Sequence, residues 1–425
     1  MLHKSYSFVL AFEPDLVSKE IQEFKLSENS RVLDPFCGTG TTLLECKIAG
    51  IPSIGIDANP VCVLLSDAKV NWSINAARTE RLANGCLQRA KRNYVRLLRR
   101  VERGTSKSIH EDRRFRRSRT GRYLVESGLI KRRWIGIRPA AKTLLLAEEI
   151  TCTPRPERNF LLLALLGILV PGISNMAYGP EIYRARERRD CDVFGKFRRR
   201  LIDNLHRLRM LRRLHPDTSA QVRYGDATQR LRGLRPSSID AVISSPPYLS
   251  DHDYTRMMRL ELVFAGCVTS GEELREVKLH LLRSSSKNVY KQDHMSSLVK
   301  DLPSVQWVIH RVRRRARTKK NGFARVYPKL VGEYFGGMFK HFEEVSRVVK
   351  PGGWLAYIVG DQSSFFAIPI KTSEILVELA ERAGGLRLVS KRPIKVLRGT
   401  RGAVRWKNRE WLIVLRKPKG AKTQT

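Results

Sequence analysis

The sequence lacks the cysteine patterns of disulfide-bonded and zinc-binding proteins. It contains seven cysteines in 425 residues, an odd number, and no two of them form a Cys-x-x-Cys pair. A secreted disulfide framework normally uses an even set of cysteines, and structural zinc sites normally use closely spaced pairs. We therefore expect no disulfide framework, no metal site and a location in the reducing cytoplasm.

Long apolar runs are also missing. The longest, residues 160–170, is far below the ~20 residues that cross a bilayer, so we expect it to form a buried helix. The stretch at residues 5–12 is too short for a secretory signal, and Glu13 and Asp15 follow it at once. We expect no association with a membrane.

Acidic residues are scarce. The chain has 41 Asp and Glu against 80 Lys and Arg, which gives a net charge of +39. A field of this sign favours polyanions, because each neutralised phosphate releases condensed counterions. Nucleic acid is therefore the favoured partner, and a generally basic or ribosome-associated protein is the alternative. The length predicts about two or three domains.

Strands and helices alternate near the N-terminus. Residues 31–33 form a predicted strand that enters a glycine-rich turn, and residues 41–49 form a helix closed by Gly50. A second predicted strand, 54–56, ends at Asp57. Asn59 and Pro60 then supply an N-cap and a first-turn proline for a helix over 61–70. This alternation implies a parallel sheet with right-handed crossovers.

The same pattern resumes later in the chain. We predict strands at 221–224, 239–244 and 354–359, an antiparallel closing pair at 386–389 and 411–415, and helices at 333–349 and 372–383. The expected fold is α/β and Rossmann-like, with a mostly parallel seven-stranded sheet, an antiparallel last strand and basic helical insertions.

The glycine-rich turn, Asp34-Pro-Phe36-Cys-Gly38-Thr-Gly40-Thr41-Thr42, is a candidate cofactor site. Its glycines allow the backbone to approach a ligand closely, and the amides that begin the next helix can meet an anion. The turn has neither the Gly-Lys-Ser/Thr ending of a triphosphate loop nor the third glycine of a dinucleotide fold. A tight turn without a ligand is the alternative.

Three carboxylates follow predicted strands and complete this candidate site. Asp34 would suit an ammonium group, Asp57 could accept from both ribose hydroxyls, and Asp226 could accept from an adenine amino group. Ammonium, ribose and adenine occur together in S-adenosyl-L-methionine. The predicted cofactor-binding residues are Asp34, Phe36, Gly38, Gly40, Thr41, Thr42, Asp57 and Asp226.

A second motif, Ser245-Pro246-Pro247-Tyr248, directly follows the predicted strand 239–244. An exocyclic amine of cytosine or adenine is a poor nucleophile, because its lone pair is delocalised into the ring. Hydrogen bonds from that amine to the Ser245 side chain and the Pro246 carbonyl would favour a tetrahedral nitrogen. Tyr248 could stack on an extruded base. We predict that Ser245, Pro246, Pro247 and Tyr248 are catalytic; a β-turn in any loop is the alternative.

Chemistry at cytosine C5 would instead need an activated thiolate, typically placed by a Pro-Cys pair. The sequence has no such pair. Cys37, in the cofactor turn, is therefore predicted to serve packing.

At these residues the chain resembles S-adenosylmethionine-dependent DNA amino-methyltransferases, specifically the bacterial and archaeal site-specific cytosine-N4 type. The pairing of the glycine-rich motif with Ser-Pro-Pro-Tyr carries the resemblance, which covers residues 3–72 and 221–415. Supporting matches are His3-x-x-Tyr6 with Phe12-x-Pro14, Asp253-Tyr254-Thr255-Arg256, Leu260-Glu261-Leu262, Lys350-Pro351-Gly352-Gly353, Gly360-Asp361 and Arg409-Glu410-Trp411. The resemblance implies a class I methyltransferase fold, with the N-terminal motif folded over the methionine end of the cofactor.

The resemblance also bears on the substrate. In this family Asp-Pro-Pro-Tyr usually marks adenine N6 and Ser-Pro-Pro-Tyr cytosine N4, so Ser245 favours N4 methylation of a flipped cytosine in double-stranded DNA. Adenine-N6 methylation, RNA amino-methylation and a non-enzymatic nucleic-acid binder are the alternatives. The implied setting is the nucleoid, in a restriction-modification system with a separately acting cognate endonuclease, or as a solitary modification enzyme.

Two insertions interrupt the predicted core. Residues 90–138 are dense in arginine and poor in periodic apolar positions, and a helix is predicted at 160–171 and a basic amphipathic one at 194–214. A backbone-tracking surface, rather than a solvated charged face, is predicted for Arg113, Arg114, Arg116, Arg117, Arg119 and Arg122 with the interleaved Phe115 and Tyr123.

The expected division of the chain follows from these interruptions. It comprises the cofactor-binding first part of the core (1–75), a basic helical insertion that contacts DNA (76–218), the catalytic strand and loop (219–250), a second insertion that recognises the target (251–329), the last part of the core (330–417) and a disordered tail (418–425). The first insertion precedes the Asp226 strand, where the family's usual target-recognition domain is not expected. The location of sequence readout therefore stays open.

Overall fold

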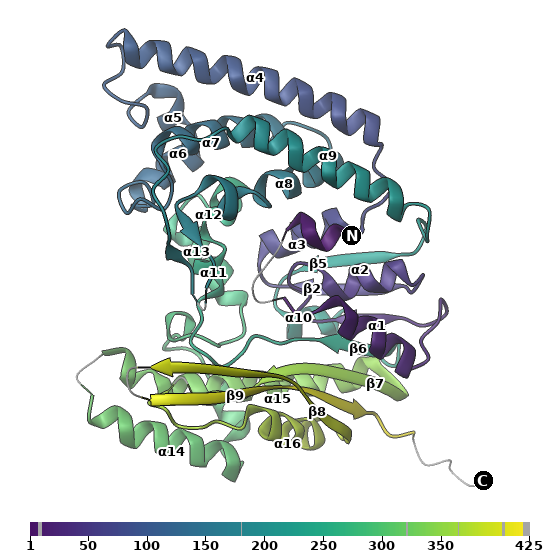
Figure 1. The fold of residues 1–425 in the computed structure, drawn as a ribbon. Coiled ribbons are helices and arrows are strands. Elements are labelled where there is room, and N and C mark those ends of the chain that lie inside the picture. The colour runs from purple at the N-terminus through teal and green to yellow at the C-terminus, as the bar shows by residue number, and fades with distance from the viewer. Residues whose placement is uncertain (7–10, 180, 320–321, 364, 402–403, 420–425) are drawn as a thin grey trace.

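A computed structural model describes residues 1–6, 11–179, 181–319, 322–363, 365–401 and 404–419. The predicted tail lies largely outside these residues. The centre of the fold is a seven-stranded sheet in the order β5-β2-β1-β6-β7-β9-β8 (Figure 1). Its strands are β1 (Val32–Asp34), β2 (Ser53–Asp57), β5 (Ala220–Tyr224), β6 (Ile239–Ser244), β7 (Val349–Gly360), β8 (Arg387–Arg401) and β9 (Val404–Arg416).

The pairing of the strands confirms the predicted sheet. Strands β5, β2, β1, β6 and β7 pair in parallel, whereas β9 runs antiparallel to both of its neighbours, β7 and β8. The central parallel strands β1, β2 and β6 are almost wholly buried, as expected for a sheet with helices on both faces, whereas the edge strand β5 is partly exposed.

Helices cover the two faces of the sheet. On one face α1 (Pro14–Glu23) and α2 (Thr41–Ile48) pack against side chains such as Val32 and Ala356, with α3 (Pro60–Val70) beside them. On the other face lie α10 (Ala227–Arg232), α15 (Tyr327–Val348) and α16 (Thr372–Gly384). They pack against the residues next to Val32 and Ala356 in the same strands, Leu33 and Leu355. This alternation is the two-residue period of a strand.

The predicted helix boundaries hold at the cofactor end. Gly50 adopts a φ of +75° after α2, and Asn59 accepts a hydrogen bond from the Val61 amide at the start of α3. Asp226 caps α10 through the amide of Gln229.

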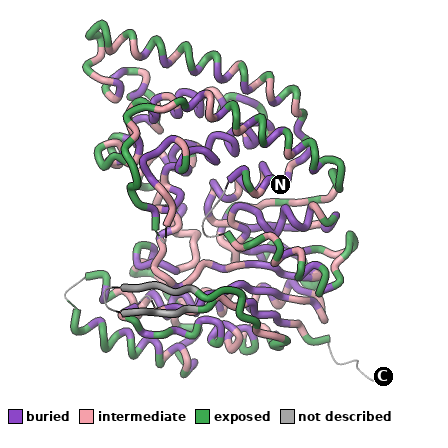
Figure 2. Tube along the Cα trace, viewed as in Figure 1, coloured by how far each residue is buried: buried purple, intermediate pink, exposed green. Residues whose placement is uncertain are grey.

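The first insertion forms a helical layer stacked on α3 and continuous with its hydrophobic core. The layer contains α4 (Ala76–Glu102), α5 (Arg113–Arg117), α6 (Arg119–Glu126), α7 (Ile137–Thr151), α8 (Glu157–Leu166), the π-helical turn η2 (Leu169–Ile173), the strand pair β3 (Met176–Ala177) and β4 (Tyr183–Arg184), and α9 (Val193–Leu211). In Figure 2 its inner helices are mostly buried, whereas α4 alternates between buried and exposed residues.

The structure corrects two interpretations of this layer. Residues 90–102 are not poor in periodic apolar positions, because they belong to the 27-residue helix α4, whose buried positions recur at helical spacing: Ala83, Cys86, Leu87, Ala90, Tyr94 and Leu97. Arginines such as Arg92 and Arg96 stand between these positions and obscure the period. Phe115 and Tyr123 are also buried core residues, so they do not interleave with the arginines on a surface.

The second insertion packs in two places. Its helices are α11 (Tyr254–Met257), α12 (Arg259–Phe264), α13 (Gly271–His280) and α14 (Pro303–Arg317), with 3-10 turns η3 (Ser286–Asn288), η4 (Met295–Val299) and η5 (Gly322–Arg325). Helix α12 joins the core of the helical layer, whereas η4 and α14 pack on α15. Residues 251–329 therefore do not form one packed unit. In the described part of the chain, no helix has the length and apolar character to cross a membrane.

Candidate active site

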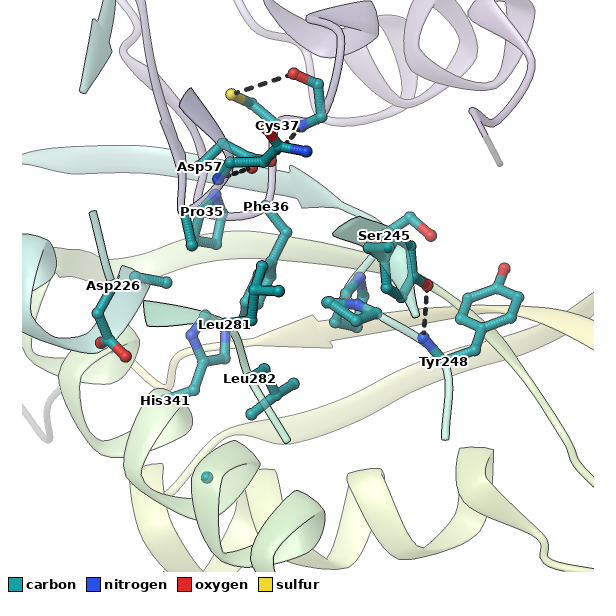
Figure 3. A pocket seen from close by; sticks show the side chains of 18 of the residues that line it. Pro35, Phe36, Cys37, Asp57, Asp226, Ser245, Tyr248, Leu281, Leu282 and His341 are labelled. Atoms are coloured by element: carbon teal, nitrogen blue, oxygen red, sulfur yellow. Dashed lines mark hydrogen bonds between the residues drawn. The ribbon is translucent and has the colours of Figure 1, made fainter. Parts of the chain in front are cut away.

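A cavity of about 630 Å³ opens at the carboxyl ends of the parallel strands (Figure 3). This edge is where open α/β sheets bind ligands. Both predicted motifs line the cavity: Phe36, Gly38 and Thr41 from the first, and all of Ser245–Tyr248 from the second. The motifs are far apart in sequence, but β1 and β6 are paired neighbours, so the turns that follow these strands meet.

The two glycines of the turn have different roles. Both have positive φ, +50° at Gly38 and +82° at Gly40. A Cβ at Gly38 would meet nothing within 4 Å, whereas a Cβ at Gly40 would lie 2.9 Å from Ser66 Oγ. Gly38 therefore leaves open space along the cavity wall, and Gly40 allows α2 to pack closely on α3.

Asp57 ends β2 and points into the same space. Its Oδ2 accepts a hydrogen bond from the Gly38 amide and its Oδ1 accepts one from the Asn59 amide, each at 2.8 Å. Burial raises the pKa of Asp57 to about 6, although the two hydrogen bonds act in the opposite direction and lower the pKa. The carboxylate is therefore fixed in place and charged at neutral pH, with lone pairs still available to a ligand.

Asp226 lies in the same region, at the end of the neighbouring strand β5. It follows β5, lines the cavity and accepts a hydrogen bond from the Gln229 amide at 3.0 Å. Figure 3 shows the side chain of Phe36 extending into the space between Asp57 and His341. Asp57, Phe36 and Asp226, three of the predicted cofactor residues, thus line one cavity, and their binding of a cofactor stays a prediction.

Asp34 is placed differently from Asp57 and Asp226. Its side chain is fully buried and does not line the cavity. Oδ1 accepts hydrogen bonds from Ser244 Oγ at 2.6 Å and from the Phe36 amide at 3.2 Å, while Oδ2 has no hydrogen-bond partner among the described residues. Burial raises the pKa of Asp34 to about 6. In this structure Asp34 joins the ends of β1 and β6 and does not line the cavity, and its predicted contact with an ammonium group stays a prediction.

Gly40 and Thr42 are also behind the cavity wall. Thr42 is buried, and its hydroxyl donates to the Ile243 carbonyl at 3.1 Å. These two predicted cofactor residues therefore hold the turn in shape without lining the cavity. Cys37 is buried as predicted, and burial raises the pKa of its thiol well above the usual value.

Ser245 is oriented by the neighbouring strand. Its hydroxyl donates to the Ile358 carbonyl of β7 at 3.1 Å. A serine hydroxyl has one hydrogen and two lone pairs, so this bond leaves the oxygen free only as an acceptor. Pro246 and Pro247 continue the lining, and neither adds a backbone donor.

Tyr248 is held by contacts that the sequence did not reveal. Its hydroxyl donates to Glu410 Oε1 at 3.0 Å, and its amide donates to the Tyr254 hydroxyl at 3.2 Å. The ring packs so closely on Gly360 that a Cβ there would lie 3.0 Å from Tyr248 Cε2. Burial raises the pKa of Tyr248 well above its usual value, so the phenol stays a neutral donor.

Glu410 and His341 are two lining residues that sequence reasoning missed as site residues. Glu410 pairs with Gly360 across the antiparallel strands β9 and β7, which brings it to the catalytic edge. His341, on α15, lies with its ring centroid 4.9 Å from that of Phe36. Burial lowers the pKa of His341 to about 3, so the ring is neutral. No spacing in the sequence links either residue to the two motifs.

The N-terminal motif reaches the same cavity. Ala11, Phe12 and Glu13 line it, and the Tyr6 hydroxyl donates to Glu261 of α12 at 3.0 Å. Residues 7–10, within the predicted fold-back, lie outside the described residues. Across the described chain, no group of three or more His, Cys, Asp or Glu is arranged to hold a metal ion.

Comparison with known proteins gives matches to DNA methylases. A family model described as DNA methylase matches residues 12–66, which include the glycine turn and Asp57. The chain is 24% identical over 408 residues to the type II methyltransferase M.AvaI of Nostoc sp., covering 90% of this chain and 78% of that protein.

Two further relatives agree. The type II methyltransferase M.BsoBI of Geobacillus stearothermophilus is 24% identical over 416 residues, with the same coverage of both chains. M.MjaII of Methanocaldococcus jannaschii is 35% identical, but over 69 residues that make up 16% of this chain. By the family match over residues 12–66 and by the similarity along most of the chain, this protein is similar to DNA methyltransferases of the N4/N6 type, and one cavity holds both of its motifs.

Proposed function

We propose that this chain is a type II DNA methyltransferase that transfers a methyl group from S-adenosylmethionine to the N4 amine of a flipped cytosine in duplex DNA. The observation that supports the proposal most directly is the shared cavity, in which the Gly38 turn and Tyr248 face one space. Methyl transfer requires that the donor bound by one motif and the base bound by the other come into contact. The relatives that match along most of the chain are type II methyltransferases by name.

The residues along the sheet edge fit the proposed cofactor. The free lone pairs of Asp57 suit two ribose hydroxyls, Asp226 suits an adenine amino group, and the open side of Gly38 allows close approach to the backbone. S-adenosylmethionine would supply an electrophilic methyl group on its sulfonium. Asp34 positions this wall through Ser244 and Phe36, and Thr42 does so through Ile243.

The second motif would hold the base amine. Ser245 Oγ, whose hydrogen is committed to Ile358, can accept one amine hydrogen, and the Pro246 carbonyl can accept the other. These bonds draw the nitrogen lone pair out of conjugation with the ring. S-adenosylmethionine held at Gly38, Asp57 and Asp226 would supply the methyl group to this nitrogen, with the carbon–sulfur electron pair leaving on sulfur, and the methylated amine would lose one proton to water. No enzyme side chain is modified.

Tyr248 would present its ring to the extruded base. Contact with Gly360 and the hydrogen bond to Glu410 fix the ring. Binding of the base therefore costs no additional entropy for ordering this side chain. The choice of cytosine rests on Ser245, because a neutral hydroxyl takes the place of the carboxylate of Asp-Pro-Pro-Tyr.

The proposal is tested by expressing the chain in cells that lack DNA methylation and analysing nucleosides from digested genomic DNA by mass spectrometry. We expect N4-methylcytosine with the wild type and much less of it with Ser245→Ala. N6-methyladenine would overturn the assignment of the base, and unmodified DNA with modified tRNA would overturn the assignment of DNA as substrate. Single-base sequencing of the same DNA would give the recognised sequence.

We also propose that the enzyme acts on the nucleoid in the cytoplasm and that a separate endonuclease cutting the same sequence is its partner. DNA from the expressing cells should then resist one sequence-specific endonuclease that cuts DNA from cells carrying Ser245→Ala. Cleavage by every candidate endonuclease would favour a solitary modification enzyme.

A further inference from the structure

A second hollow lies away from the cavity, where the end of α4 meets the loop before α5. It has a volume of about 970 Å³ and shares no lining residue with the candidate active site. In Figure 1 this region lies at the far side of the helical layer from the sheet. Its lining residues are Arg96, Arg99, Arg100, Arg103, Thr105, Ser106, Lys107, Glu111, Arg113 and Arg116.

The charge of this arginine hollow is strongly one-sided. Six arginines and Lys107 line it, against one carboxylate, Glu111. Arg100 is paired with Asp112 at 2.7 Å, and the other cationic lining residues have no carboxylate partner among the described residues. Like charges held together repel one another, and an anion bound between them would relieve that repulsion.

The hollow has an ordered wall. Asp112 is fully buried, accepts two hydrogen bonds from Arg100 and one from Ser106 Oγ, and caps α5 through the Arg114 amide. Phe115, the middle residue of α5, is buried in the core of the layer. The loop from 103 to 112 is thus fixed at both ends, and its exposed arginines are held on a packed base.

The chemistry of the hollow suits phosphodiesters better than bases. None of its described lining residues is aromatic, and single-stranded nucleic acids are normally held by stacking on aromatic rings. Guanidinium groups bind phosphate oxygens through paired hydrogen bonds. We propose that this hollow binds the phosphodiester backbone of the substrate duplex at a distance from the flipped base. The proposal rests on duplex DNA being the substrate.

The helix packing indicates how far the hollow lies from the active-site cavity. Helix α4 packs on α7, and α7 contacts α12, which follows the cavity residue Met258. Two helix-to-helix steps of about 8–10 Å each lie between the hollow and the cavity wall, which corresponds to a separation on the order of 16–20 Å. At a spacing of 3.4 Å per base pair, that distance is about five or six base pairs of duplex beyond the target. The hollow therefore anchors flanking DNA.

The test uses the exposed pair Arg99→Gln/Arg103→Gln, with Arg209→Gln/Arg213→Gln on and after α9 as a control of equal charge. Fluorescence anisotropy with a random duplex of about 30 base pairs, measured across a salt series, gives the slope of log affinity against log salt. Two lost phosphate contacts should reduce that slope by about 1.8. The control should keep the wild-type slope, and cofactor binding should be unchanged in both variants.

Further arms separate the possible outcomes. An unchanged slope in the hollow variant, an equal loss in the control, or tighter wild-type binding of structured RNA than of duplex DNA would each overturn the proposal. If wild type methylates no DNA but the hollow variant still loses slope, the proposed function fails, and the hollow is shown to bind duplex phosphates without anchoring a substrate. On duplexes centred on the modified base, the advantage of wild type over the hollow variant should disappear when each flank is shorter than about five base pairs.

Discussion

The contrast between left-handed glycines gives a direct test of where the cofactor lies. Gly38 has a φ of +50° and open space where a Cβ would project, and it lines the cavity. Gly385, after α16, has a φ of +61° and equally open space, but it does not line the cavity. Replacing either glycine with alanine therefore costs the same kind of backbone strain, and only one of the two new methyl groups would meet a ligand.

The expected magnitudes follow from these two positions. A non-glycine residue in the left-handed region costs about 1–2 kcal/mol, so Gly38→Ala and Gly385→Ala should both lower the free energy of unfolding by that amount. In Gly38→Ala the methyl group also occupies ligand space, and overpacking of this kind costs about 1–3 kcal/mol. The dissociation constant for S-adenosylmethionine should therefore rise about 5- to 150-fold in Gly38→Ala alone.

Isothermal titration of each variant with S-adenosylmethionine, together with urea unfolding, measures both effects. A dissociation constant for Gly38→Ala within twofold of wild type would refute the placement of the cofactor against this turn. A matching loss in Gly385→Ala would show that reduced stability, and not contact with the ligand, weakens binding.

Three further predictions concern the reacting groups. Ser245→Ala should lower the single-turnover rate on the order of 10²-fold without changing cofactor affinity, and a normal rate would contradict its role as acceptor. Tyr248→Phe and Glu410→Gln should be coupled by about 1.5–3 kcal/mol in a double-mutant cycle of rates, whereas additive effects would show that their bond does not orient the ring. Because burial raises the pKa of Asp57 to about 6, from 3.8, the unliganded protein should gain stability as pH falls from 7 towards 4, and Asp57→Asn should remove that part of the gain. Cofactor affinity should fall over the same window in wild type as Asp57 gains its proton, and a pH-independent affinity would contradict a role for the carboxylate.

The local signals in the sequence were sufficient for the core elements. Asn59 caps α3 and Pro60 is its first residue. An Asn-Pro pair favours a helix start, because the cap and the fixed φ of proline both act within one turn. Gly38 and Gly40 similarly allow left-handed backbone at little cost, and the structure has it at both positions. Such preferences are properties of neighbouring residues, so no tertiary information is needed to predict them.

Local signals were weak or incomplete at other positions. The buried positions Ala90, Tyr94 and Leu97 of α4 stand among arginines such as Arg92 and Arg96, which obscure the helical period. Asp34 has the residue type and position of a cofactor ligand, but its burial depends on Ser244 of the neighbouring strand. Burial of an individual side chain depends on which helices and strands pack over it, and the neighbouring sequence does not predict those distant elements.

The sequence by itself therefore determined the strand–turn–helix units, the sheet class and the two motifs, because short-range sterics and periodic burial decide these. Only the tertiary structure decided that Glu410 holds Tyr248, that His341 lies beside Phe36, and that the end of α4 and the start of α5 form one arginine hollow. Sheet order and helix packing bring these groups together across long stretches of chain, and no local preference records which distant segments will become neighbours.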